Sequence, residues 1–230
     1  MITNFYKEQE TFYLAIDCII LGFDNEKLRL LLIKRNFEPH QGEWSLMGGF
    51  LRKKESLDDA AQRILTKLTG LQNVFLEQLY TYGEVHRDPG QRVISVAYYS
   101  LIHQERYKEE VGQRHNARWF DFDKVPKLVF DHNQMVEKAH KRLMRRSKTQ
   151  PIGFELLPEK FTIPQLQNLY EAINLQKYDK RNFRKKILSM NVLQKLDEKD
   201  KENSRRGAYL YQFDKEKYDY LLSKGYHFEI

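Results

Sequence analysis

Residues 49–71, GFLRKKESLDDAAQRILTKLTGL, contain the most regular spacing of candidate chemical groups in the sequence. Glu55 follows Gly49 after five intervening residues, and Arg63 follows Glu55 after seven. A carboxylate such as that of Glu55 is the kind of oxygen ligand that Mg²⁺ takes, and Mg²⁺ demands near-octahedral coordination. A bound metal of this kind neutralises negative charge and helps to generate an attacking hydroxide. Glu55 alone makes a poor Mg²⁺ site.

The same stretch predicts an amphipathic helix, because its apolar residues recur three and four positions apart. Ser56, with Asp59 three residues later, is a candidate N-cap, and Gly70 is a candidate C-terminal stop. The alternative interpretation is an ordinary amphipathic helix that matches the spacing by chance.

The spacing resembles the Nudix box, G-x5-E-x7-R-E-U-x-E-E-x-G-U, and residues 42–50, GEWSLMGGF, resemble the run that leads into it, with Met47 in place of proline. Three glutamates of the family are replaced by Ile64, Lys67 and Leu68, which share one helix face. The resemblance implies the scaffold of a pyrophosphate hydrolase without the groups that would hold its metal. We therefore expect no metal, no cofactor and no catalytic residue. The residues found at family positions are Gly49, Glu55, Arg63, Leu65, Gly70 and Leu71.

Length and composition are typical of a soluble globular protein with one large or two small domains. The longest apolar run, residues 12–23, is interrupted by Asp17 and is too short to span a bilayer. With Cys18 as a single core thiol and no signal peptide, we expect a cytoplasmic protein with no membrane partner. The net charge of +7 predicts an anionic partner if the charge is clustered.

The first 148 residues are expected to form one domain. Strands are predicted at residues 12–21, 28–35 and 93–102, and a helix at 132–146. Residues 79–92, LYTYGEVHRDPGQR, resemble a segment of ADP-ribose-type Nudix proteins and of Nudix-related transcriptional regulators, and residues 118–121 and 128–132 resemble the closing segment of that subfamily. The basic run between Lys138 and Lys148 is interpreted either as a solvated helix face or as a surface beside DNA.

A linker at residues 149–153 precedes a second domain with a different pattern. From Lys177 to Arg206 the sequence has eleven basic and five acidic residues, so the positive charge is clustered. Helix, turn, helix and charged hairpin is the plan of a winged helix-turn-helix. The predicted elements are a helix from Pro164 capped by Thr162, a helix from Asp179 to Met190 with Phe183, Ile187 and Leu188 inward, strands at 192–196 and 208–213 around a polar loop at 197–207, and a helix at 215–222 capped by Asp214.

The two signatures in this order resemble the Nudix-related transcriptional regulator family over nearly the whole chain. The resemblance implies an α+β protein: a Nudix-like α/β/α sandwich with a mixed sheet at residues 1–148 and a small winged helix domain at 149–230. It also implies a homodimer that binds operator double-stranded DNA, most simply a repressor, and whose first domain senses a small-molecule effector without catalysis. A pentose such as arabinose is the expected effector, and ADP-ribose is the second choice.

A metal-dependent Nudix hydrolase of ADP-ribose or a related nucleoside diphosphate is the alternative, with the basic domain as a substrate or RNA platform. The candidate effector-binding residues lie on segments expected to line the cleft, and the candidate DNA-binding residues lie on the second predicted helix, its surroundings and the wing. For the effector they are Asp17, Lys34, Arg35, Glu43, Trp44, Arg52, Glu55, Lys67, Tyr82, His86 and Asp88. For DNA they are Thr162, Gln165, Lys177, Lys180, Arg181, Asn182, Arg184, Lys185, Lys199, Lys201, Arg205 and Arg206.

Overall fold

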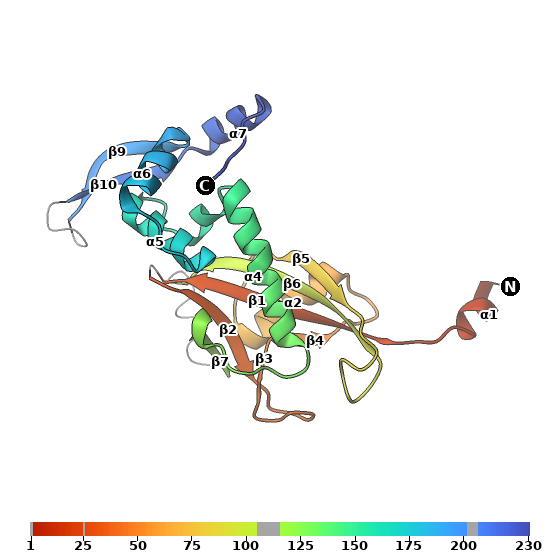
Figure 1. The fold of residues 1–230 in the computed structure, drawn as a ribbon. Coiled ribbons are helices and arrows are strands. Elements are labelled where there is room, and N and C mark those ends of the chain that lie inside the picture. The colour runs from red at the N-terminus through yellow and green to blue at the C-terminus, as the bar shows by residue number, and fades with distance from the viewer. Residues whose placement is uncertain (1, 25, 105–115, 202–206) are drawn as a thin grey trace.

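A mixed sheet lies at the centre of the N-terminal lobe, which runs from β1 to α4 (Figure 1). The computed structural model describes residues 2–24, 26–104, 116–201 and 207–230, and their side chains except at residues 2–4, 153 and 155. Within these residues the strand order is β3-β2-β1-β6-β5, with β4 paired to β1 and β7 to β2. The strands are β1 Tyr13–Phe23, β2 Leu28–Lys34, β3 Trp44–Ser45, β4 Met47–Phe50, β5 Glu77–Tyr82, β6 Val93–His103 and β7 Ala117–Asp121.

Strand β1 is the central strand, and it is apolar on both faces because a helix covers each face. Ile16, Cys18 and Ile20 point toward α2 Leu57–Thr69. The alternate residues, including Ile19 and Leu21, point toward α4 His132–Thr149. The predicted α/β/α sandwich with a mixed sheet is therefore confirmed, with β1 parallel to β6 and antiparallel to β2 and β4.

Helix α2 begins and ends as its sequence predicts. The Ser56 hydroxyl accepts a hydrogen bond from the Asp59 backbone N–H, and the Asp59 carboxylate accepts one from the Ser56 backbone N–H in return. Gly70 ends the helix in the left-handed conformation, at φ 81°, which glycine adopts without a Cβ clash.

The C-terminal lobe is the winged helix-turn-helix that the sequence predicts. Its three-stranded sheet has the order β8-β10-β9 among the described residues, and Asp179 and Asp214 cap the helices that follow them. The elements are η3 Ile152–Leu156, β8 Phe161–Thr162, α5 Ile163–Asn174, α6 Lys180–Ser189, β9 Leu193–Asp200, β10 Ala208–Phe213 and α7 Lys215–Ser223.

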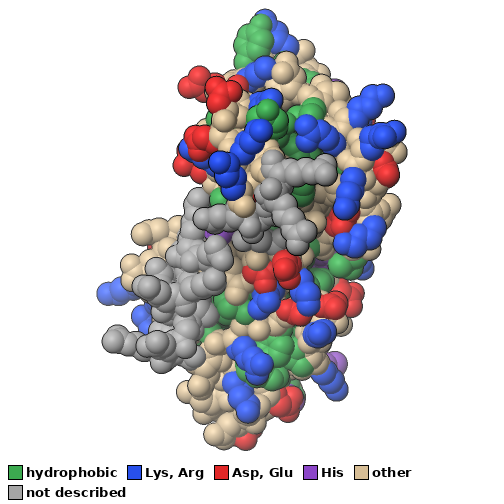
Figure 2. All heavy atoms as spheres, turned by 90° about the vertical axis from the view of Figure 1, so that its left-hand side faces the viewer, with side chains coloured by type: hydrophobic (Ala, Val, Ile, Leu, Met, Phe, Trp, Pro, Cys, Tyr) green, Lys and Arg blue, Asp and Glu red, His purple; other side chains and the backbone are tan. Residues whose placement is uncertain are grey.

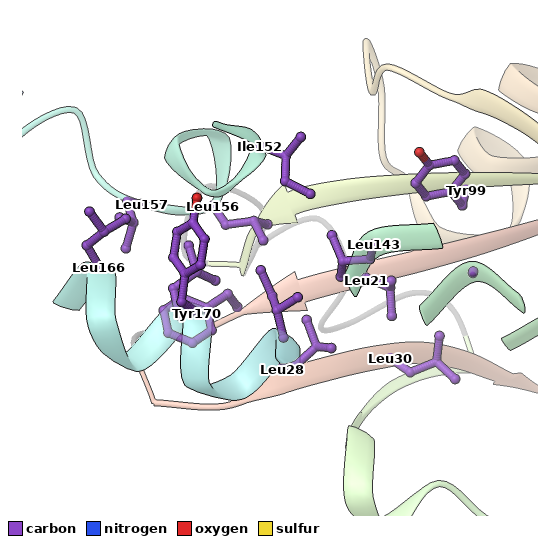
Figure 3. Close-up of a cluster of buried hydrophobic side chains, with 14 of the residues drawn as sticks. Leu21, Leu28, Leu30, Tyr99, Leu143, Ile152, Leu156, Leu157, Leu166 and Tyr170 are labelled. Carbon is purple, nitrogen blue, oxygen red and sulfur yellow. The ribbon is translucent and has the colours of Figure 1, made fainter. Parts of the chain in front are cut away.

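The two lobes share one hydrophobic core. Leu21 and Leu28 of the sheet, Leu143 of α4 and Tyr170 of α5 belong to the same buried cluster (Figure 3). The segment predicted to be a linker, residues 149–153, is packed: α4 runs to Thr149, Ile152 is buried, and η3 follows at once. Because the residues after Pro151 are largely apolar, their burial between the lobes is more favourable than their exposure to water in a flexible linker. The division at residue 148/149 stays a prediction.

Two local predictions are wrong. Leu188 is 36% exposed, because Phe183 and Ile187, four residues apart, already form the inward face of α6 and the next residue turns toward solvent. Strand β9 extends to Asp200, beyond the predicted strand end at 196. The remaining described elements are α1 Ile2–Lys7, which stands clear of the sheet in Figure 1, and η2 Phe122–Lys124. Among the described residues, no helix combines the length and apolar character needed to cross a membrane.

Candidate functional site

A cavity of about 630 Å³ opens in the N-terminal lobe, where β1, β2, β4 and α2 meet the loop after β5 and the start of α4. Five residues predicted to bind the effector line it, and three phenylalanines add apolar surface. The predicted residues are Asp17, Lys34, Arg35, Lys67 and Asp88. The phenylalanines are Phe37, Phe50 and Phe130.

A buried group of charges forms part of the cavity wall. Arg87 donates two hydrogen bonds to Asp131, from Nε at 2.9 Å and from Nη2 at 2.6 Å. Its Nη2 also lies 3.8 Å from the Asp17 carboxylate, which accepts a 2.5 Å hydrogen bond from the Ser95 hydroxyl. Burial works against the charged guanidinium, but Asp131 raises the pKa of Arg87 above its usual value. The hydrogen bonds from Arg87 to Asp131 therefore stabilise the charged guanidinium in the cavity wall.

His132, the first residue of α4, joins this cluster to the helix. Its Nδ1 accepts a hydrogen bond from the Leu46 backbone N–H at 3.2 Å. The ring proton of the neutral form must then sit on Nε2, which lies 3.5 Å from Asp17 Oδ1. Burial lowers the pKa of His132 below its ordinary value, against the pull of Asp17 and Asp131. A neutral His132 thus donates toward Asp17.

Gly48 is required by the close approach of Asp17. A Cβ placed on Gly48 would lie 2.4 Å from Asp17 Oδ1, far inside van der Waals contact. Strands β1 and β4 pair Asp17 with Gly48 directly, so the carboxylate covers the glycine. The first glycine of the pair before α2 therefore makes room for a buried acid.

The rim of the cavity combines a cation with aromatic rings. The guanidinium carbon of Arg35 lies 4.3 Å from the centre of the Phe37 ring and 5.3 Å from that of Phe130. Arg35 Nε donates to the Pro39 carbonyl at 2.9 Å, which fixes the side chain at the end of β2. Partial burial lowers the pKa of Arg35, although neighbouring carboxylates oppose the shift.

The helix that follows the glycine pair does not offer a magnesium site. Glu55 is held by Arg63, whose Nη2 and Nε donate to it at 2.6 and 2.8 Å, and this pairing lowers its pKa to about 2. Ile64 is buried, and Leu68 and Lys67 line the cavity. Across the ranges that the structure describes, no three His, Cys, Asp or Glu side chains gather as metal ligands. These residues therefore do not fit Mg²⁺.

Six residues predicted to bind the effector lie outside the cavity lining. Trp44 packs edge-on against Phe120 with ring centres 4.7 Å apart, because β3 turns the indole toward the core. Tyr82 packs against the same core, and Glu55 is occupied by Arg63. The remaining three point elsewhere: Glu43 pairs with His40, and Arg52 and His86 are exposed.

The lining residues that sequence reasoning missed include Arg87 and His132. Both lie in the segments at 79–92 and 128–132 that resemble the regulator family, so the signal was present. Of the two neighbours chosen instead, Asp88 lines the cavity and His86 is exposed, because successive loop residues give no sign in the sequence of which side chain turns inward.

Helix α4 runs along the sheet of the N-terminal lobe toward the C-terminal lobe (Figure 1). Its first residue, His132, lies in the cavity wall, and near its middle His140 Nε2 donates to the Ile173 carbonyl of α5 at 2.7 Å. Near its end Ser147 contacts Asn174 of α5, while Arg146 bonds Glu77 of β5 and the Tyr99 hydroxyl of β6. Two of the six basic residues of this run are thus paired with the sheet, since Arg142 also pairs with Glu77.

Helix α6 presents a row of basic and amide side chains to solvent. Figure 2 shows Lys and Arg side chains over much of the upper lobe on this face of the molecule. The Asp179 carboxylate accepts from the Asn182 backbone N–H, which orders the first turn of the helix. The predicted DNA-binding residues of α6 are all exposed: Lys180, Arg181, Asn182, Arg184 and Lys185.

The other predicted DNA-binding residues divide into three groups. Thr162 and Gln165 form the capping box of α5, and Thr162 is buried, so its hydroxyl is occupied inside the lobe. Lys177 is 90% exposed although it pairs with Glu171 at 2.6 Å. In the wing, Lys199 and Lys201 are exposed, and Lys199 lies 4.7 Å from the centre of the Tyr209 ring. Arg205 and Arg206 lie outside the described residues.

A Nudix-type sandwich with a cavity is joined in this chain to a winged helix that presents an exposed basic helix, an architecture that defines a Nudix-related DNA-binding protein. Comparison with known families agrees: the NUDIX domain matches residues 11–142, and the NrtR DNA-binding winged helix domain matches residues 153–213. The chain therefore belongs to the NrtR family of Nudix-related transcriptional regulators, and it is a DNA-binding transcriptional regulator.

Three relatives illustrate the match. The ADPR-responsive transcriptional repressor NtrR of Acinetobacter baylyi is 31% identical over 90% of this chain and 84% of its own length. Shewanella oneidensis NrtR complexed with a 27mer DNA superposes with a TM-score of 0.76 at 28% identity, over 87% of this chain and 93% of that one. The NUDIX domain of the same protein complexed with ADP-ribose superposes with a TM-score of 0.52 at 28% identity, over 60% and 92%.

Proposed function

We propose that this protein is a transcriptional repressor that binds ADP-ribose, or a closely related nucleotide, in the cavity of its N-terminal lobe and releases operator DNA in response. The observation that carries the proposal is the cavity lining, in which three cations, in addition to the Arg87 that is paired with Asp131, accompany phenyl rings. A nucleoside diphosphate needs cations for its phosphates and flat apolar surface for its base. Lys34, Arg35 and Lys67 supply the charge, and Phe37 and Phe130 supply the surface.

The relatives support a nucleotide over a sugar. One is described as ADPR-responsive, and the NUDIX domain of another was solved with ADP-ribose. The expectation of a pentose such as arabinose finds no support among them, and an uncharged sugar gives no role to three cations. Isothermal titration with ADP-ribose and with arabinose tests the choice: we expect binding of ADP-ribose alone. Binding of arabinose in preference to ADP-ribose would overturn it.

We further propose that binding is not followed by hydrolysis. Glu55 is occupied by Arg63, and the neighbouring helix face has Lys67 and Leu68 at the cavity. Without carboxylates to hold Mg²⁺, nothing there generates a hydroxide for attack on a diphosphate. The competing function is a metal-dependent ADP-ribose hydrolase. Sustained release of AMP from ADP-ribose in the presence of Mg²⁺ or Mn²⁺ would establish that function instead.

For operator binding we propose a homodimer that places α6 of each protomer in the major groove. Residues near the start of such a helix read base edges, while other cations neutralise phosphates. Arg181 lies in the first turn of α6 and is exposed. In a mobility shift with a duplex selected from a random pool, we expect Arg181→Ala to weaken binding by about 1–3 kcal/mol.

Lys53 provides the matched control, because it is exposed on the N-terminal lobe and outside the cavity lining. Lys53→Ala should bind the selected duplex as the wild type does. Affinity should also fall steeply with salt, since each phosphate contact releases a counterion. An Arg181→Ala variant with unchanged affinity would remove α6 from the interface.

A further inference from the structure

The helix face that looks into the cavity from α2 has an ammonium group where carboxylates would bind a metal. Lys67 lines the cavity together with Leu68, its neighbour in α2. Ile64, one turn earlier, is buried and packs closely on Gly49, where an added Cβ would lie 3.1 Å from the Ile64 side chain. The face is thus committed to one cation and two aliphatic side chains.

Lys67 is available to a ligand. Its side chain is exposed, and it makes no hydrogen bond or ion pair with any residue that the structure describes. The nearest acid of the same box, Glu55, already has both oxygens on Arg63 and one on the Arg52 backbone N–H. Three acids line the cavity, Asp17, Glu38 and Asp88. Asp17 is occupied by Ser95 and faced by Arg87 and His132, and Asp88 accepts a hydrogen bond from the Gly90 backbone N–H.

We propose that Lys67 replaces the divalent metal as the counter-charge for the diphosphate of the effector, so that this protein binds ADP-ribose independently of Mg²⁺. The proposal rests on ADP-ribose, or a nucleotide with the same diphosphate, being the effector. An ammonium group is a compact point charge with three donors, which suits phosphate oxygens. Unlike a metal, it has no coordination position for water, so it stabilises the bound diphosphate without activating a nucleophile.

Replacement of the metal by Lys67 also allows the nucleotide to bind without being hydrolysed. A metal site made of carboxylates is repulsive to a diphosphate until the metal is bound. A lysine is attractive at once, since it is positively charged at neutral pH. The sensor then responds to the concentration of free nucleotide and does not require a second ion. Added Mg²⁺ gives no gain in affinity, because these residues offer it no ligands.

Isothermal titration of the full-length protein with ADP-ribose, first in excess EDTA and then in excess MgCl₂, tests the proposal. We expect the same Kd in both buffers. Replacing Lys67 by Met, which keeps an unbranched apolar side chain, or by Ala should weaken ADP-ribose binding about tenfold to a hundredfold in either buffer, the value of one or two charge-assisted contacts. Lys53→Ala, the exposed control, should leave the Kd unchanged.

Each result decides one question. Wild-type binding that needs Mg²⁺ would overturn the role of Lys67 while leaving ADP-ribose as the effector. Metal-independent binding that survives both Lys67 substitutions, in variants whose thermal unfolding matches the wild type, would overturn it in the same way. No ADP-ribose binding by the wild type in either buffer would overturn the proposed function itself. Because Lys67 is exposed, Met and Ala are expected to leave the fold intact.

Discussion

Removing Arg87 should destabilise the protein more than any exposed substitution does. The Arg87 and Asp131 side chains are 4% and 11% exposed, and their two hydrogen bonds measure 2.6 and 2.9 Å. Arg87→Met keeps the apolar stem but leaves Asp131 and the nearby Asp17 as buried carboxylates without a cation between them. Deleting one partner of a buried pair costs about 3–5 kcal/mol, because the remaining charge stays desolvated.

The complementary substitution should cost less. Asp131→Asn leaves Arg87 with a second carboxylate, that of Asp17, at 3.8 Å. The free energy of unfolding should then fall by about 1–3 kcal/mol, the cost of leaving one charged contact unsatisfied. The double variant removes both charges, so its cost should fall short of the sum of the two single costs by about 1–3 kcal/mol.

Urea unfolding at neutral pH measures these differences. Trp44 and Trp119 both lie in the N-terminal lobe, so tryptophan fluorescence reports on the lobe that contains the pair. Arg118→Met is the matched control: Arg118 is exposed, and its loss should change the free energy of unfolding by no more than about 0.5 kcal/mol. A cost below about 1 kcal/mol for Arg87→Met, or single costs that add within about 0.5 kcal/mol, would refute the buried pair as a stabilising unit.

Three further predictions concern the cavity and the helix that leaves it. Burial lowers the pKa of both His132 and His140, so these histidines take up protons at a higher pH in the unfolded chain than in the folded protein. The free energy of unfolding should therefore decrease as the pH falls below 6.5, the ordinary pKa of histidine. A urea midpoint that does not change as the pH falls below 6.5 would contradict this prediction. Gly48→Ala should abolish ADP-ribose binding in isothermal titration by pushing Asp17 aside, whereas Gly83→Ala, with open space at its Cβ, should not. His140→Leu removes the hydrogen bond from α4 to α5, so ADP-ribose should still bind but should change the DNA affinity less than it does in the wild type. DNA titrations with and without ADP-ribose measure this change in affinity. A change as large as that of the wild type would show that this contact does not couple the two sites.

The sequence by itself determined the secondary structure around the candidate sites. The capping box of Ser56 and Asp59, the left-handed Gly70 and the Thr162 cap are local signals. The first two set the boundaries of α2 where they were predicted, and α5 begins at Ile163, one residue before the predicted start. The absence of metal-binding acids at positions 64, 67 and 68 was equally legible, because it depends on residue types alone. The clustering of positive charge on the second domain could likewise be read from the residue types alone.

Only the tertiary structure decided which side chains meet. Arg87 and Asp131 are 44 residues apart, and their pairing turns Arg87 inward while His86 and Asp88, on either side of it, differ in whether they reach the cavity. Trp44 looked like a ligand-binding surface in the sequence, yet strand pairing turns it onto Phe120. The packed connection at Ile152 depends on Leu143 and Tyr170 from different lobes. Such contacts are long-range, and local patterns of apolar and polar residues cannot specify them.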